Sequence, residues 1–292
     1  MFPAIIENYC RPESIAEALA ALAGYEAGEA LFIAGGQSLM QAIKSRMVRP
    51  RCLIDLQAIA ELKGISTSQG LKIGAMTRYV EIAGAEAIPA AFAALRDAAQ
   101  HVGDRQVRNR GTLGGSCCWN YLASCMPAVT LGLGGRFHLL SAGGQARVLD
   151  ADDFLIGPLE TARADDEILT HVEFPSASAT GSAYRKWGLV TDALPVVGFC
   201  MKVTVDSAGR CASARIALSG LPAGAQRAPA GESALVGSDG QDAQLDAALE
   251  AIVASVEVQS DKWAEAGYRQ QLIRTLGREV AAQAFARARG RA

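Results

Sequence analysis

Two short stretches decide how this sequence is interpreted. The first is Ala34-Gly35-Gly36-Gln37-Ser38, which directly follows the apolar run Leu31-Phe32-Ile33, and the second is Thr112-Leu113-Gly114-Gly115-Ser116. A glycine pair lets the main chain adopt positive φ and approach a ligand closely, and successive N–H groups in such a loop can converge on an anion such as pyrophosphate. One such pair is typical of an ordinary strand-to-helix turn. Two pairs favour a phosphate-binding site.

Neither stretch matches a well-known phosphate-binding motif. The G-x-G-x-x-G fingerprint of Rossmann domains and the G-x-x-x-x-G-K-[ST] loop of P-loop NTPases are both absent from these stretches. The surrounding pattern predicts a strand over 31–34, the glycine pair, and then a helix or helical turn over 37–43. A different phosphate-binding design is therefore expected.

The rest of the sequence predicts a mixture of helices and strands in two domains. Because 292 residues exceed the usual size of one hydrophobic core, two domains are expected. The small, polar segment after Pro175 has the composition of a connection, which places the predicted domains at 1–176 and 177–292. Apolar periodicity predicts strands at 52–56, 71–75, 168–174, 183–187, 196–205 and 212–218, a hairpin at 137–140 with 146–149, and helices from Ile15 and at 89–102, 127–133, 242–253 and 263–288.

Composition excludes several classes of protein. Half of the residues are apolar and a fifth are charged, which is typical of a folded globular chain. With 28 basic and 30 acidic side chains and no long basic run, nucleic acid is not an expected partner. No signal peptide or transmembrane segment is predicted, so a cytoplasmic location with seven reduced cysteines is expected.

Four ordered motifs resemble those of the medium, FAD-binding subunit of molybdenum hydroxylases, the family of carbon monoxide dehydrogenase and xanthine dehydrogenase. The motifs are Ala34 to Leu39, Ile73 to Thr77, Arg108 to Gly115, and Met126 to Ala128. The resemblance covers essentially the whole chain. It implies an α+β fold in which a two-subdomain FAD-binding domain of the vanillyl-alcohol oxidase (PCMH) type is followed by a smaller α+β C-terminal domain.

The same resemblance implies FAD as the cofactor and a set of residues that hold it. Both glycine-rich stretches would wrap the pyrophosphate and ribityl chain through backbone amides. Lys186 would be a cation able to support negative charge on the reduced isoalloxazine. The implied cofactor-binding residues are Phe32, Ile33, Ala34, Gly35, Gly36, Gln37, Ser38, Leu39, Thr77, Gly111, Thr112, Gly114, Gly115, Ser116, Ser124, Cys125, Leu169 and Lys186.

The sequence departs from the family pattern at two of these positions. The family usually has Asn after the second glycine pair and Asp before the Met/Leu-Pro, whereas this chain has Ser116 and Cys125. A thiol is a poor hydrogen-bond acceptor and lacks the fixed charge of a carboxylate. Two polar flavin contacts are therefore predicted to be altered, and the intervening segment 117–121 would give the flavin edge an unusual lining.

No metal site or catalytic residue is predicted within the chain. Cys117, Cys118 and Cys125 lack C-x-x-C spacing and a fourth ligand, so they are interpreted as free thiols. The resemblance therefore implies a molybdenum-cofactor large subunit and a 2Fe-2S small subunit as partners, with electrons leaving FAD for an external acceptor such as NAD, oxygen or a quinone. Two alternatives stay open: a stand-alone FAD-dependent oxidase or dehydrogenase, and a scaffold subunit without FAD.

Overall fold

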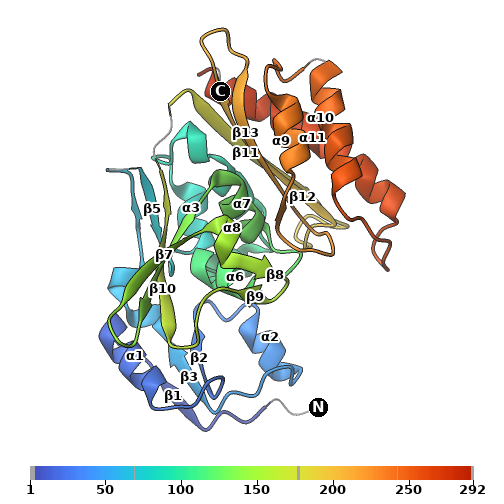
Figure 1. Ribbon diagram of the computed structural model, residues 1–292. Coiled ribbons are helices and arrows are strands. Elements are labelled where there is room, and N and C mark those ends of the chain that lie inside the picture. The colour runs from blue at the N-terminus through green and yellow to red at the C-terminus, as the bar shows by residue number, and fades with distance from the viewer. Residues whose placement is uncertain (1–3, 69, 176–177, 242, 291–292) are drawn as a thin grey trace.

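The N-terminal part is a small parallel sheet with a helix against it. The structure is a computed structural model that describes residues 4–68, 70–175, 178–241 and 243–290 (Figure 1). Its first sheet has the strand order β1-β3-β2, with β1 at Asn8–Cys10, β3 at Cys52–Asp55 and β2 at Ala30–Ile33. Helix α1 (Ile15–Ala23) begins at Ser14, whose side chain accepts a hydrogen bond from the Glu17 N–H, as expected of a serine N-cap. The predicted first helix and the strands predicted at 31–34 and 52–56 are confirmed, whereas β1 was not predicted.

An antiparallel sheet forms the second layer. Its strand order is β4-β5-β10-β6-β7, and the predicted hairpin is confirmed as the β6–β7 pair. The helices of the same region pack beside this sheet, and their apolar side chains join those of β5, β6 and β10 in one core. The strands are β4 Ile65–Ser66, β5 Leu71–Gly74, β10 Glu167–Phe174, β6 Arg136–Ser141 and β7 Ala146–Asp150.

One predicted helix of this layer is divided in the structure. The helix predicted over 89–102 is divided into a 3-10 turn at Ala90–Phe92 and helix α4 at Ala94–His101. Pro89 precedes the turn. The remaining elements of this part are α2 Leu39–Lys44, α3 Tyr79–Gly84, α5 Arg105–Arg110, α6 Leu113–Trp119, α7 Cys125–Leu133, α8 Ala151–Phe154, β8 Leu155–Gly157, β9 Glu160–Thr161 and the 3-10 turns Leu56–Ala58 and Ala60–Leu62.

The C-terminal part is an antiparallel sheet with helices on one face. Figure 1 shows α9, α10 and α11 covering the outer face of strands β11 to β13, while α7 lies on the inner side. The predicted strands and the two long helices are confirmed, although residue 242 of the predicted helix lies outside the described residues. The elements are β11 Thr180–Trp187, β12 Val197–Val205, β13 Cys211–Ser219, β14 Gln226–Arg227, α9 Pro229–Leu235, α10 Ala243–Ser255 and α11 Ala266–Ala288.

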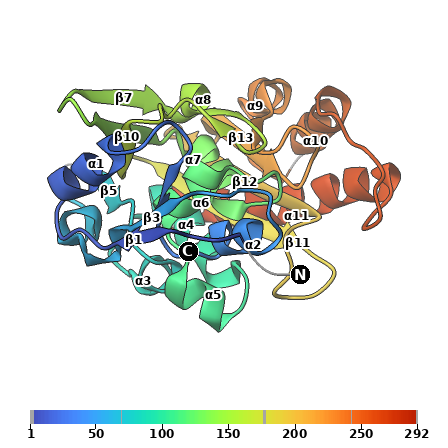
Figure 2. The same cartoon turned by 90° about the horizontal axis from the view of Figure 1, so that it is seen from below.

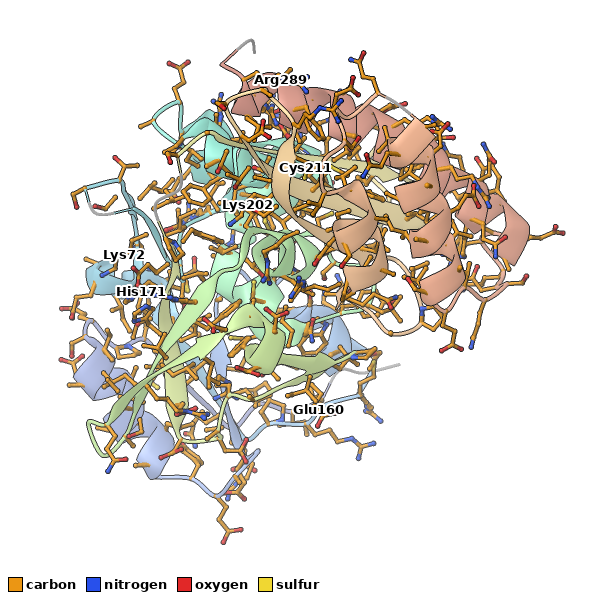
Figure 3. All side chains as sticks on the ribbon, turned by 45° about the horizontal axis from the view of Figure 1, so that its top comes forward. Lys72, Glu160, His171, Lys202, Cys211 and Arg289 are labelled. Carbon is orange, nitrogen blue, oxygen red and sulfur yellow. The ribbon has the colours of Figure 1, made fainter. Side chains whose placement is uncertain are left out.

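The two parts share a buried interface centred on α7. Every residue of α7 is buried, and Tyr184 and Cys200 of the C-terminal sheet belong to the same core as Met126. Lys202 donates a hydrogen bond to the Leu133 carbonyl at 2.7 Å, and Figure 3 labels this lysine near the centre of the molecule. The observed architecture confirms the α+β prediction. The predicted boundary between 176 and 177 falls on residues outside the described ranges and stays a prediction.

Candidate FAD-binding site

A long cleft of about 1220 Å³ runs between the N-terminal sheet and the C-terminal part. Drug-sized ligands occupy pockets of about 300–1,000 Å³, so this cleft is large enough for a dinucleotide. Residues from β2 and α2 line one side, α6 and the start of α7 line another, and the loop between β11 and β12 lies at the far end. Seen from below, α2 and α6 lie side by side near the middle of the molecule (Figure 2).

The first glycine stretch forms an open loop between β2 and α2. Gly36 has a φ of +72°, which glycine adopts readily, so this prediction of a positive-φ turn is confirmed. The N–H groups of the four residues 35–38 make no hydrogen bond within the described part of the chain. These residues line the cleft. Four successive free amides in an αL-containing turn provide the donor set that a pyrophosphate needs.

The second glycine stretch is the first turn of α6, so the prediction that it is a loop with positive φ is wrong. Thr112 caps the helix, and its Oγ1 accepts a hydrogen bond from the Gly115 N–H at 3.1 Å. The N–H groups of Leu113, Gly114 and Ser116 donate to the carbonyls of Thr77, Ala75 and Thr112. A threonine N-cap with these backbone bonds favours helix over loop. The amides of residues 113–116 therefore already have partners within the protein.

The glycines of the second stretch serve close packing instead. A Cβ on Gly114 would lie 2.6 Å from the Ala75 Cβ and 2.8 Å from the Ala75 carbonyl oxygen, whereas one on Gly115 would lie 3.2 Å from the Ala34 Cβ. In the first stretch, a Cβ on Gly35 would lie 2.1 Å from the Arg110 carbonyl oxygen. The first stretch thus packs against the segment just before the second, and the second packs against Ala75 and Ala34, in contacts that leave no room for side chains at these glycines.

Most of the residues predicted from the resemblance meet in the cleft. Ile33 and Thr77 are absent from its lining. Thr77 is fully buried, where its hydroxyl accepts a hydrogen bond from the Gly64 N–H and donates one to the Gly64 carbonyl, both at 3.0 Å. Thr77 therefore lies behind the cleft wall, where its carbonyl accepts the Leu113 N–H at the start of α6. The lining includes Phe32, Ala34, Gly35, Gly36, Gln37, Ser38, Leu39, Gly111, Thr112, Gly114, Gly115, Ser116, Ser124, Cys125, Leu169 and Lys186.

The cleft also contains aromatic and charged residues that the sequence analysis did not single out. Tyr25 lies just beyond α1, Tyr79 begins α3 and is buried, and Arg163 follows the β8–β9 hairpin. The Arg163 Nη1 donates to the Glu167 carbonyl at 2.7 Å, which fixes it at the cleft wall. Burial raises the pKa of Tyr79, with its Ser116 hydrogen bond acting in the opposite direction. No local pattern marks these residues, because the tertiary fold brings them to the cleft.

The end of the cleft nearest the C-terminal part holds Cys125 and Lys186. Lys186 Nζ donates to the Ala193 carbonyl at 2.5 Å, which ties the β11–β12 loop to its own strand. Burial lowers the pKa of Lys186 and raises the pKa of the Cys125 thiol. Burial also raises the pKa of Cys118 to about 11, so this cleft-lining thiol is protonated at neutral pH. Within the described residues no group of His, Cys, Asp and Glu side chains is arranged to hold a metal ion.

Comparison with known proteins covers both parts of the chain. Residues 4–177 match the family model described as "FAD binding domain in molybdopterin dehydrogenase", and residues 182–284 match "CO dehydrogenase flavoprotein C-terminal domain". The carbon monoxide dehydrogenase medium chain of Hydrogenophaga pseudoflava is 32% identical over 96% of this chain and 97% of its own length. The nicotine 6-hydroxylase medium subunit of Paenarthrobacter nicotinovorans is 33% identical over 98% and 99%.

Comparison with solved structures indicates the same family. A chain of carbon monoxide dehydrogenase from Hydrogenophaga pseudoflava superposes with a TM-score of 0.90 at 32% identity, covering 98% of this chain and 99% of that one. Among the described helices, none is both long and apolar enough to cross a membrane.

Proposed function

Because the chain belongs to the family of FAD-binding medium subunits of molybdenum hydroxylases, we propose that it takes electrons from iron-sulfur clusters of a partner subunit and passes them through FAD to an external acceptor. Membership confirms the predicted resemblance, the FAD cofactor and the oxidoreductase class. FAD supplies the electron-carrying chemistry when it is bound. The chain's own residues would hold and orient it, and would set the electrostatic field around it.

The single observation that supports this assignment best is the pair of backbones at the centre of the cleft. Residues 35–38 line the cleft with N–H groups that make no hydrogen bond within the described residues, and Gly35 and Gly115 let the neighbouring segments pack closely around them. We assign the pyrophosphate to the first stretch, because the amides of the second already have partners. The second stretch would form the wall against which the cofactor packs. The cleft-lining members of the predicted set remain our proposed FAD contacts.

The partners follow from what the chain lacks in its sequence. The seven cysteines show no iron-sulfur motif, which supports an iron-sulfur electron donor on another polypeptide. Its relatives are named medium chains or medium subunits. We therefore propose a molybdenum-cofactor large subunit and a 2Fe-2S small subunit as partners of this chain.

The cofactor assignment is tested by flavin content. The purified protein should show flavin absorbance near one FAD per chain. A valine at Gly36 should abolish it, because φ there is +72°, and a valine at Gly115 should do the same by filling the space beside Ala34. Gly84→Ala is the matched control, since a Cβ there meets nothing within 4 Å and its φ is not positive. Full flavin retention in both valine variants, with native circular dichroism, would contradict the proposed site.

The electron-transfer role is tested by reconstitution. Flavin in the isolated chain should stay oxidised in the presence of the complex's substrate and become reduced only when the large and small subunits are added. Substrate-dependent reduction of the isolated chain would favour the stand-alone oxidase or dehydrogenase instead. A colourless protein that takes up no added FAD would favour the scaffold.

A further inference from the structure

Helix α7 presents its N-terminal end to the cleft. Ser124 and Cys125 line the cleft, and Ser124, the N-cap residue, makes no side-chain capping bond. Within the described part of the chain, the N–H groups of Cys125 and Met126 make no hydrogen bond, and Pro127 has none. A helix carries about half a positive charge at its N-terminus, concentrated in these unpaired N–H groups.

The other end of α7 is balanced by cations from the C-terminal part. Lys202 Nζ donates to the Leu133 carbonyl at 2.7 Å, and Arg215 Nη2 donates to the Leu131 carbonyl at 3.0 Å. These bonds complement the negative end of the helix dipole. The first turn of α7, which begins at Cys125, contains no acidic residue. The asymmetry leaves a positive field directed into the cleft.

Lys186 adds a cationic side chain at the same place. Its ammonium group lines the cleft and uses one of its three N–H donors on the Ala193 carbonyl. Its ionisable neighbours are the Cys125 thiol from α7, the Asp192 carboxylate from the β11–β12 loop and the Arg108 guanidinium from α5. Asp192 is exposed at the rim, where water screens its charge. Arg108 adds to the positive charge.

Cys125 is the residue positioned to compensate this field, and it carries no charge. Its side chain is 4% exposed, with Tyr184 behind it and Lys186 beside it. Burial raises the pKa of this thiol and that of the Tyr184 hydroxyl, so both are neutral at pH 7. The buried surroundings at this end of the cleft therefore contain one ammonium group, a helix N-terminus and two uncharged side chains.

We propose that Cys125 sets a high reduction potential for the flavin, because it leaves the charges of Lys186 and of the α7 N-terminus uncompensated. This inference rests on the proposed function, since it places FAD in the cleft with the isoalloxazine beside Lys186, as the family resemblance implies. Reduction adds negative charge to the cofactor, and a positive field in a water-poor site binds the more negative form more tightly. The ratio between the affinities for reduced and oxidised FAD sets the shift in reduction potential, and each tenfold change corresponds to about 30 mV for two electrons. Cys125 is thus a tuning residue that acts through the local field.

The test is a redox titration of the FAD-loaded full chain against indicator dyes. Cys125→Asp supplies the missing charge and should lower the preference for the reduced cofactor at least tenfold, which is about 30 mV for a two-electron couple. Cys125→Ser, which stays neutral, should change that preference less than twofold. Cys118→Asp is the matched control, because it places a carboxylate on the same cleft from α6, beside Arg163. Cys118→Asp should shift the reduction potential of the bound FAD less than Cys125→Asp does.

A second substitution guards against a variant that folds poorly. Lys186→Gln removes the ammonium charge and should also lower the preference for the reduced cofactor at least tenfold. The inference is overturned if Cys125→Asp or Lys186→Gln binds FAD with the wild-type reduction potential. It is also overturned if Cys125→Ser or Cys118→Asp shifts the potential as much as Cys125→Asp does. It also fails if neither Cys125→Asp nor Lys186→Gln binds FAD, because Cys125 and Lys186 would then be needed for binding the cofactor and not for tuning its potential. Wild-type protein without FAD would contradict the proposed function itself.

Discussion

Arg287 of α11 and Asp97 of α4 form a two-pronged ion pair across the interface between the two parts of the molecule. Nη1 lies 2.6 Å from Oδ2 and Nη2 lies 2.9 Å from Oδ1, and each side chain is 15% exposed. Asp97 Oδ2 also accepts the Tyr184 N–H at 3.1 Å, and Arg287 Nη1 donates to the Ser182 carbonyl at 2.7 Å. The pair therefore fixes β11, the strand that carries Lys186 to the cleft.

Replacing Asp97 with Ala should destabilise the protein strongly. The substitution leaves a mostly buried guanidinium without its counter-ion, and breaking a buried pair from one side costs about 3 kcal/mol or more. The free energy of unfolding, measured in urea, should fall by about that amount. Glu250→Ala is the matched control, because the Arg274–Glu250 pair links α10 to α11 with the same two-pronged geometry but a carboxylate side chain that is 59% exposed. Its loss should be much smaller, because solvent screens this exposed carboxylate. Equal losses in the two variants would show that the Asp97 pair has no special role.

Local patterns in the sequence predicted most of the fold. The first helix, the β6–β7 hairpin and the strands β10 to β13 have clear periodicity or turn signals, so neighbouring residues alone determine their type. The position of Gly35 against the Arg110 carbonyl, by contrast, joins residues far apart in the chain. The four motifs of the family resemblance provided that long-range information, which periodicity does not contain.

The errors of prediction have a common physical cause. The sequence favours a loop at Gly114 and Gly115, because a glycine pair permits positive φ. The bonds from the Leu113 and Gly114 N–H groups to the Thr77 and Ala75 carbonyls instead fix the start of a helix. A tertiary contact thus overrides a local preference. Tyr25, Tyr79 and Arg163 were not predicted as cleft residues for a related reason, since tertiary contacts bring them to the cleft from separate elements. Cys125 was recognised as an altered flavin contact, but its place at the end of a buried helix became apparent only in the fold.

Removing the cap of α6 should have a small effect on stability and a measurable one on FAD binding. Thr112→Ala deletes the acceptor of the Gly115 N–H, and loss of an N-cap costs about 1 kcal/mol. The start of α6 would then be held less firmly against the first glycine stretch, so FAD affinity should fall several-fold. Thr112→Ser keeps the cap and should restore both properties. Affinity is measured by fluorescence titration of apoprotein with FAD.

Ser14→Ala is the control for this prediction. Ser14 caps α1 in the same way, with its Oγ accepting the Glu17 N–H at 3.2 Å, but it lies outside the cleft. It should lower stability by a similar amount of about 1 kcal/mol without changing FAD affinity. If both alanine variants weaken FAD binding equally, the effect reflects global stability and the proposed role of the α6 start is wrong.

Stability should decrease as the pH falls from 6.5 towards 4, and His171 should account for part of the decrease. Burial, then the charges of His138 and Lys72, lower the pKa of His171 to about 4, whereas the charge of Glu173 opposes them. Figure 3 shows Lys72 beside His171, and the ring of His171 stacks on that of His138 with centroids 4.0 Å apart.

The direction of the pH effect follows from proton binding. Between pH 6.5 and 4 the unfolded chain binds a proton at His171 that the folded chain does not, so acid favours unfolding there. Because the ring is partly exposed, solvent screening reduces the effect to about 1 kcal/mol. His171→Gln removes the titrating group. Urea unfolding at pH 7 and pH 4.5 should therefore show that the wild type loses about 1 kcal/mol more than the variant over this interval. An equal loss in both proteins would mean that His171 titrates at its ordinary pKa in the folded state.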